Sequence, residues 1–231
     1  MDHILGIDTS TAHLSVAVTA ADEVLGERLV EPDPSGRPRH AREVLGAVEE
    51  VLGAGGWAAI TRIAVGTGPG TFTGLRIGIA TARGLAQSRS IGISGVSSLR
   101  ALASGSDSAA PVLAVLDAKR SEVFAALYDG SSEIWEPAVH RPEDLAERVR
   151  EQALTLTAVG DGAVRFRGEM EASGAQIPPD DAGVHRVRAR HVCLLASEAG
   201  AEPLADINPT YLRRPDAELW RERDRGTTSG R

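Results

Sequence analysis

The feature that most constrains the fold is a short pattern that occurs twice: an apolar segment ending in an aspartate, then a second apolar segment six residues later. In the first half, residues 4–8 end in the aspartate and an alternating apolar run begins at Leu14. In the second half, residues 113–117 end in it and the next run begins at Val123. A period of two is typical of a half-buried strand. The sequence therefore predicts the same strand–turn–strand unit in each half.

Each half continues with a third strand, an amphipathic helix and a strand that ends in Gly-x-Gly. In the first half the third strand covers about residues 23–30 and the helix follows Pro38; in the second half the helix begins at Pro142. The closing strands end in Gly66-x-Gly68 and Gly160-x-Gly162. The order β-β-β-α-β in both halves predicts a duplicated α/β fold.

The chain of 231 residues is long enough for two small domains. A stretch of Ser, Gly, Asp, Ala and Pro at residues 104–111 has no apolar periodicity and marks the expected boundary. We predict a first domain over residues 1–103 and a second over residues 104–220. Residues 221–231 mix both charges with Gly, Thr and Ser, and this composition predicts a disordered tail.

The charge balance argues against tight nucleic-acid binding by this chain alone. The formal net charge is −7, one of the 25 basic residues is a lysine, and aromatic residues make up 3%. Phosphate neutralisation needs clustered positive charge, and base stacking needs aromatic side chains. If RNA is involved, we expect a partner to hold it.

The sequence favours the cytoplasm and argues against a membrane span. The most apolar segment is interrupted by Arg76 and Arg83, so no run approaches the roughly 20 residues needed to cross a bilayer. A single cysteine, Cys193, excludes an intramolecular disulfide, and no secretory signal opens the chain. We expect Cys193 to be a buried structural thiol in a helix.

The most distinctive segment is the glycine-rich run of residues 66–86, which passes from a strand into a helix. It matches neither a P-loop nor the dinucleotide fingerprint, yet backbone N–H groups at such a helix start can bind an anion. Within the helix, Gly74, Gly78 and Ala82 repeat every four residues and leave one face almost without side chains. This face either packs closely inside its own domain or forms an interface with a helix of another chain.

The turns after the two acid-ended strands lack the glycine that a close phosphate contact needs. Asp8 is followed by Thr9 and Ser10, and Asp117 by a turn that contains Lys119. Hydrogen-bonded or salt-bridged turns are favoured over working phosphate sites. None of the six histidines has a partner four residues away on one helix, and no Gly-x-Ser-x-Gly elbow is present. We therefore predict no catalytic residue and no metal site.

These motifs together resemble the TsaB (YeaZ) family, a bacterial branch of the actin-like ATPase superfamily. The resemblance rests on four segments in the expected order: Ile7-Asp8-Thr9-Ser10, Gly68-Pro69-Gly70-Thr71-Phe72-Thr73-Gly74-Leu75-Arg76-Ile77-Gly78, Asp117-Ala118-Lys119-Arg120 with Glu122-Val123, and Pro209-Thr210-Tyr211-Leu212-Arg213. Lys119 stands where the family usually has arginine. The resemblance implies two duplicated RNase H-like domains of the actin-like ATPase fold, with mixed five-stranded sheets and flanking helices.

The resemblance also implies a non-catalytic scaffold subunit of the machinery that makes threonylcarbamoyladenosine beside the tRNA anticodon. In that family a TsaD-type paralogue carries out the transfer and a TsaE-type ATPase joins the pair, so ATP and a divalent metal are expected on the partner subunits. This chain then requires no cofactor, meets tRNA indirectly through the complex, and forms homodimers in isolation.

By the same analogy two helices, near residues 39–54 and 73–88, form the partner interface. Its predicted residues are Val44, Leu45, Val48, Leu52, Gly74, Arg76, Gly78, Ala82 and Arg83. A vestigial nucleotide site is predicted at Asp8, Thr9, Ser10, Gly68, Gly70, Asp117, Gly160 and Gly162. On this view Gly78→Leu disrupts pairing and leaves the fold mostly intact.

Two other functions stay open on the sequence. The first is an autonomous ATPase of the same superfamily, with Asp8 and Asp117 around ATP and magnesium. The second is a glycoprotease-like peptidase, against which the missing histidine pair argues.

Overall fold

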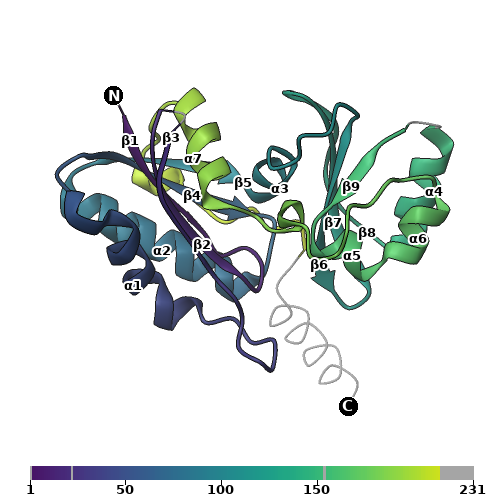
Figure 1. Cartoon of the computed structure of the whole chain (residues 1–231), viewed down its shortest axis with the longest axis horizontal. Helices are drawn as coiled ribbons and strands as arrows, with labels where there is room; N and C mark the ends of the chain where they lie inside the picture. Colours follow the sequence, from purple (N-terminus) through teal and green to yellow (C-terminus); the bar gives the residue numbers. More distant parts are fainter. Residues whose placement is uncertain (1, 22, 153–154, 214–231) are drawn as a thin grey trace, which may run out of the picture.

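A computed structural model describes residues 2–21, 23–152 and 155–213, and the predicted tail at residues 221–231 lies outside them. The chain forms two sheets side by side, each with its own helices (Figure 1). No helix in the described ranges has the length and apolar character that a membrane span requires.

The first sheet has five strands in the order β3-β2-β1-β4-β5. The antiparallel strands β1 (His3–Asp8), β2 (Leu14–Ala20) and β3 (Glu23–Val30) are followed in space by β4 (Ile60–Gly68) and β5 (Gly92–Ser97), which run parallel to β1. The predicted strand–turn–strand unit and the third strand are confirmed.

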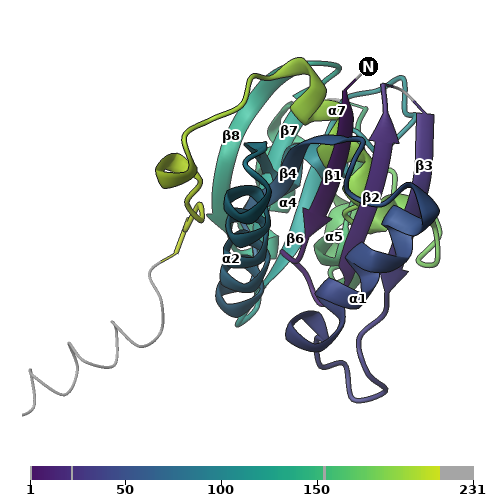
Figure 2. The ribbon, with the colours of Figure 1, turned by 90° about the vertical axis from the view of Figure 1, so that its left-hand side faces the viewer.

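Helices cover both faces of this sheet, and alternate residues of β1 point to different layers. Leu5 and Ile7 pack with α1 (His40–Leu52) and α2 (Phe72–Arg89), which Figure 2 shows on the near side of the sheet. Ile4 packs on the other side with α7 (Ala189–Glu198). Gly6 permits this approach, because a Cβ there would lie 2.6 Å from both Ala189 O and Cys193 Sγ. Cys193 is fully buried in α7, as predicted.

The second sheet has four strands in the order β8-β7-β6-β9 within the described residues, where the resemblance implied five. Its strands are β6 (Val112–Lys119), β7 (Glu122–Asp129), β8 (Ser132–His140) and β9 (Thr157–Val159). Its helices are α4 (Pro142–Gln152), α5 (Asp161–Arg165) and α6 (Arg167–Ala172), and α3 (Ser98–Ala103) lies between the two sheets. The order β-β-β-α-β is confirmed in both halves.

The predicted domain boundary needs one correction, because the chain returns to the first sheet near its end. Helix α7 contacts β1, β2 and β4, although it falls in the range 104–220 assigned to the second domain. After the short helical turns η2 (Gly183–His185) and η3 (Leu204–Asp206), Thr210 N–H donates to Thr67 O at 2.7 Å. Apolar packing against the uncovered face of the first sheet decides this return, and local composition at residues 104–111 carries no signal of it.

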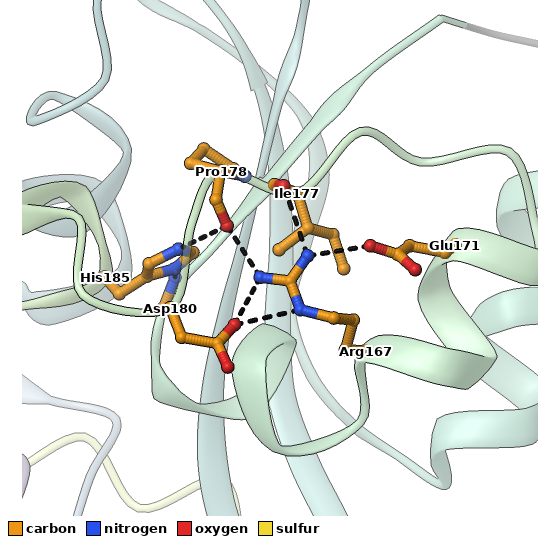
Figure 3. Close-up of polar contacts among 7 residues, drawn as sticks. Arg167, Glu171, Ile177, Pro178, Asp180 and His185 are labelled. Carbon is orange, nitrogen blue, oxygen red and sulfur yellow. Dashed lines mark hydrogen bonds and ion pairs between the residues drawn. The ribbon is translucent and has the colours of Figure 1, made fainter.

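The segment that leads back to the first sheet is tied down by Arg167 of α6 (Figure 3). Its guanidinium donates to Asp180 Oδ1 at 2.9 Å, to Glu171 Oε1 at 2.7 Å and to Pro178 O at 2.6 Å. The neighbouring His185 ring accepts a hydrogen bond from Gly160 N–H at its Nδ1 atom, 3.1 Å away. A planar five-donor group can hold several acceptors in this way, so Arg167 orders the segment at residues 177–180, while His185 holds the turn at Gly160.

The packing of α7 predicts a pH dependence of stability. Burial, with help from the positive charge of Arg190, lowers the pKa of His191 to about 4. Arg190 Nε also donates to His191 Nε2 at 3.1 Å, which requires an unprotonated nitrogen there. Between about pH 6.5 and pH 4 the unfolded chain therefore binds a proton that the folded chain does not, so this contribution to stability falls as pH falls.

We expect the free energy of unfolding to decrease from pH 7 to pH 5 in urea titrations, and to decrease less in His191→Gln. The comparison with the variant removes the contributions of the other titrating groups. A stability difference between the two proteins that does not change with pH contradicts this role of His191.

Candidate functional site

The predicted nucleotide-site acid of the first half, Asp8, is already occupied by donors of its own chain. It is 1% exposed at the end of β1. Its Oδ1 accepts from Ser10 N–H at 2.9 Å and from Ser10 Oγ at 2.7 Å, and its Oδ2 accepts from Ser98 Oγ at 2.9 Å. Burial raises the pKa of Asp8, while these hydrogen bonds oppose the rise. Asp8 therefore holds the turn after β1 to α3 and faces no open space.

The small face of α2 packs against the same turn. Thr9 Oγ1 donates to Gly74 O at 2.7 Å, and both residues are buried. A Cβ on Gly74 would lie 2.1 Å from Thr9 O, and one on Gly78 would lie 2.2 Å from Thr9 Oγ1. Ala82, next along the face, is also fully buried. Of the two open possibilities, the structure selects close packing inside the domain.

The loop between β4 and α2 also packs closely against neighbouring residues of this chain. A Cβ on Gly70 would lie 2.4 Å from Ser10 O, and Thr71 N–H donates to that oxygen at 2.7 Å. A Cβ on Gly68 would lie 3.0 Å from the Leu75 side chain. The loop is thus closed onto the turn after β1.

In the second half, Asp117 at the turn after β6 is held by salt bridges. Its Oδ2 lies 2.8 Å from Lys119 Nζ and 2.7 Å from an Arg165 guanidinium nitrogen. Burial of Asp117 opposes ionisation, but the hydrogen bonds from these cations hold its pKa below the usual value. Burial raises the pKa of Asp161, whose Oδ1 accepts from Asp117 N–H at 2.9 Å. The two acids are thus part of a paired network.

The Gly-x-Gly turn of the second half also packs on its own backbone. A Cβ on Gly160 would lie 2.0 Å from Val115 O, and one on Gly162 would lie 2.9 Å from the Leu116 carbonyl carbon. Its glycines allow α5 to pack against β6.

What remains between the two halves is a cavity of about 70 Å³, lined by Ser10 and Gly70 on one side and by Asp117 and Asp161 on the other. Ligand pockets are commonly about 300–1,000 Å³, and one water occupies about 30 Å³ of liquid volume. Of the predicted nucleotide-site residues, Ser10, Gly70 and Asp117 line this space, which is too small for a nucleotide. No group of three His, Cys, Asp or Glu residues suited to a metal occurs in the described parts of the chain.

The predicted partner interface needs a correction for most of its residues. The buried positions belong to this chain's own packing and are unavailable to a partner in this conformation: Val44, Val48, Leu52, Gly74, Gly78 and Ala82. The periodicity of α1 identifies its core side, and most of its apolar positions pack on the sheet. Leu45 is 56% exposed, Arg76 is exposed and Arg83 is partly exposed.

The outer side of α2 instead forms an open groove that sequence reasoning did not identify. Its volume is about 610 Å³, and Arg76, Ala80 and Gly84 line it together with Pro209 and Tyr211 from the end of the described chain. The motif that contains Pro209 and Tyr211 was visible in the sequence, but nothing local placed it beside α2.

An aromatic–arginine stack forms one end of the groove. The rings of Phe72 and Tyr211 are 5.1 Å apart, and the Arg76 guanidinium lies 3.7 Å from the centre of the Phe72 ring. Arg76 Nε donates to the Tyr211 hydroxyl at 3.0 Å. The stack fixes a charged group at the surface in one orientation.

Comparison with known proteins gives the family. A family model described as "TsaD: tRNA N6-adenosine threonylcarbamoyltransferase" matches residues 30–218. The Bacillus subtilis "tRNA threonylcarbamoyladenosine biosynthesis protein TsaB" is 30% identical over 228 residues, which cover 95% of this chain and 98% of that protein. The chain belongs to the TsaB family.

Further relatives support this membership and the fold. The Escherichia coli TsaB protein is 36% identical over 169 residues, which cover 69% of this chain and 71% of that protein. The solved structure of YeaZ from Pseudomonas aeruginosa has a TM-score of 0.73 and 30% identity, covering 92% of this chain and all of that one. EutJ from Carboxydothermus hydrogenoformans, at 14% identity and a TM-score of 0.52, shares the fold alone. The predicted family and the duplicated actin-like fold are confirmed.

The packing of α2 overturns the expectation for Gly78→Leu and leads to a matched prediction on two glycines of one helix. Gly78→Ala places its Cβ against Thr9, so we expect a loss of about 1–3 kcal/mol of stability from overpacking. Gly84 has nothing within 4 Å of its added Cβ, so Gly84→Ala should gain about 0.5–1 kcal/mol from helix propensity. Urea denaturation of both variants checks this pair. Equal effects of the two substitutions contradict the packing role of Gly78.

Proposed function

We propose that this chain is a non-catalytic subunit in the biosynthesis of tRNA threonylcarbamoyladenosine, and that it pairs with a TsaD-type threonylcarbamoyltransferase subunit. The names of its relatives and the description of the matching family model support the pathway. The observation that carries the non-catalytic role is the cavity of about 70 Å³ between the two halves. An ATPase of this superfamily holds its nucleotide between two such halves, and here the cavity between them is too small for one.

The polar groups around the cavity strengthen this proposal. A phosphate-binding turn presents free backbone N–H groups and a glycine that lets the phosphate approach. Here Ser10 N–H donates to Asp8 Oδ1 and is not free for a phosphate, and Asp117 is paired with Lys119 and Arg165. Opening the site would break these contacts and uncover buried groups at a free-energy cost. The chain on this view needs no nucleotide or metal of its own; ATP and a divalent metal are bound by the partner subunits.

The surface that suits the partner is the outer side of α1 and α2, which we call the pairing face and define by Leu45, Arg76, Ala80, Arg83 and Gly84. These two helices contact each other, so their outer sides form one continuous surface. Tyrosine and arginine are enriched at the centres of protein interfaces, and the fixed Arg76 stack offers such a centre. In the isolated chain, the same surface would support homodimers.

The charge of the chain fits an indirect role at the tRNA. With a net charge of −7, this subunit contributes little attraction to phosphate, so tRNA is held through the complex. A TsaE-type ATPase is the further partner of the pair.

The pairing face predicts the effect of two surface substitutions. Leu45→Glu and Ala80→Glu each place a charge on the exposed side of α1 or α2 without entering the core. We expect each to weaken binding to the TsaD-type subunit of the same organism by about tenfold or more, measured by calorimetry. Threonylcarbamoylation of tRNA by the reconstituted machinery should fall in parallel.

The matched control is Ile134→Glu on β8, where an apolar side chain that is 49% exposed lies on the second sheet. This variant should bind and support modification like the unmodified chain. Equal loss in all three variants contradicts the pairing face, and full modification without this chain contradicts the proposed function.

The closed cavity predicts the behaviour of the isolated chain towards nucleotide. We expect no binding of magnesium-ATP by calorimetry at millimolar nucleotide, because the cavity of about 70 Å³ does not admit it. ATP binding or turnover that is lost in Asp8→Asn or Asp117→Asn would instead establish the autonomous ATPase.

A further inference from the structure

Two arginines of α2 line the groove without an acidic partner. Arg76 and Arg83 both belong to the groove lining, and neither forms an ion pair with a described residue. Helix α2 has no acidic residue in its sequence, although acids outnumber bases by 32 to 25 in the whole chain. Among the described residues the groove is therefore lined by positive charge only, on a protein that is acidic overall.

The Arg76 guanidinium is held in one orientation and still has donors to offer. Its Nε donates to the Tyr211 hydroxyl at 3.0 Å, and it lies 3.7 Å from the centre of the Phe72 ring. A guanidinium has five N–H donors, so four remain on its two terminal nitrogens. A planar group fixed in this way matches a carboxylate, which accepts two parallel hydrogen bonds from it.

Arg83 lies on the same side of α2, further along the helix. Seven helical residues separate it from Arg76, which correspond to about two turns and about 10 Å. Between the two arginines the floor of the groove is small and apolar, at Ile79, Ala80 and Gly84. An added Cβ on Gly84 would have nothing within 4 Å, so this floor leaves room for a large side chain. The groove therefore offers a positive charge, an apolar floor and a second positive charge in that order.

A helix of a partner can match this order with side chains at positions i, i+3 or i+4, and i+7, which share one face. We propose that the TsaD-type subunit packs such a helix into the α2 groove, with one carboxylate on Arg76, a second carboxylate on Arg83 and a large apolar side chain between them. The groove volume of about 610 Å³ accommodates that apolar side chain. This assignment rests on the proposed function and adds the chemical character of the partner's contact.

The two arginines make carboxylates necessary once the groove is covered. In the free chain Arg76 is exposed and Arg83 is partly exposed, so water solvates both charges. A partner that covered them with apolar groups alone would bury two unpaired charges at a large free-energy cost. Carboxylates offset this cost, and their attraction also speeds the encounter at low salt. The arginines therefore select an acidic partner surface.

Carboxylate-to-amine crosslinking tests the contact directly. The chain has one native lysine, Lys119, which is paired with Asp117. Arg76→Lys and Arg83→Lys each place an amine in the groove, and Arg150→Lys places one on the exposed side of α4 as a matched control. Each variant is mixed with the TsaD-type subunit of the same organism at concentrations where the complex forms. A water-soluble carbodiimide then activates carboxylates for attack by a neighbouring amine, and mass spectrometry identifies the joined residues.

We expect Arg76→Lys and Arg83→Lys each to give a covalent product with an acid of the partner, and the two acids to lie about seven residues apart on one helix. The unmodified chain and Arg150→Lys should give neither product. If either groove variant gives no product with the partner although the complex forms, the proposal is overturned. Products that join two copies of this chain, without any that join it to the partner, also overturn it, because the occupant is then a second copy.

Charge reversal gives an independent measurement by calorimetry. Arg83→Glu should weaken pairing by about tenfold or more, because it places like charges together. Arg150→Glu changes the net charge by the same amount on α4 and should bind like the unmodified chain. Added salt should weaken pairing of the unmodified chain more than pairing of Arg83→Gln. Equal affinities of Arg83→Glu and Arg150→Glu contradict the carboxylate contact.

These results separate a failure of the inference from a failure of the proposed function. If no complex forms between the unmodified chain and the TsaD-type subunit, the proposed function is wrong and the inference is wrong with it. If Ala80→Glu weakens pairing and Arg83→Glu does not, the pairing face stands and the carboxylate contact is wrong.

Discussion

The contact on which most of this structure depends is the one between the small face of α2 and the turn after β1. Thr9 fits against Gly74 and Gly78, and its hydroxyl donates to the Gly74 carbonyl. This contact brings the start of α2 and the preceding loop down onto Ser10, which closes one side of the space between the two halves. It also fixes which side of α2 faces outward. The closed cavity and the exposed groove are therefore two results of one packing interaction.

The two halves hold the aspartate of the duplicated strand–turn–strand unit by different interactions. In the first half Asp8 is buried and receives hydrogen bonds from neutral hydroxyls and a backbone N–H group. In the second half Asp117 forms ion pairs with Lys119 and Arg165 at the edge of the cavity. The first arrangement stabilises the interior of the turn, and the second neutralises a charge that solvent still reaches. In this conformation each aspartate is thus engaged by groups of its own chain.

Sequence reasoning predicted the element order because periodicity and turn chemistry are local properties. Strand β3 and the start of α4 agree with the prediction. The return of α7 to the first sheet, and the position of Tyr211 beside Phe72, depend on contacts between residues far apart in the sequence. For the site, the glycine pattern of α2 showed that something approaches closely but did not identify Thr9 as the neighbour. The apolar positions of α1 were assigned to an interface because amphipathicity identifies the buried side without identifying what buries it.

Helix α2 is unusual because its inner side packs on the turn after β1 and its outer side also has the features of a packing surface. Its inner face gives up side chains at Gly74 and Gly78, each at a cost of about 0.5–1 kcal/mol in helix propensity, to reach the turn after β1. Its outer face carries Ala80, Gly84 and the arginine stack. A helix surface that contacts only solvent does not need these features. A helix that served only the core would favour longer polar residues on that outer face. We attribute this combination to the proposed pairing of the outer face with a partner subunit.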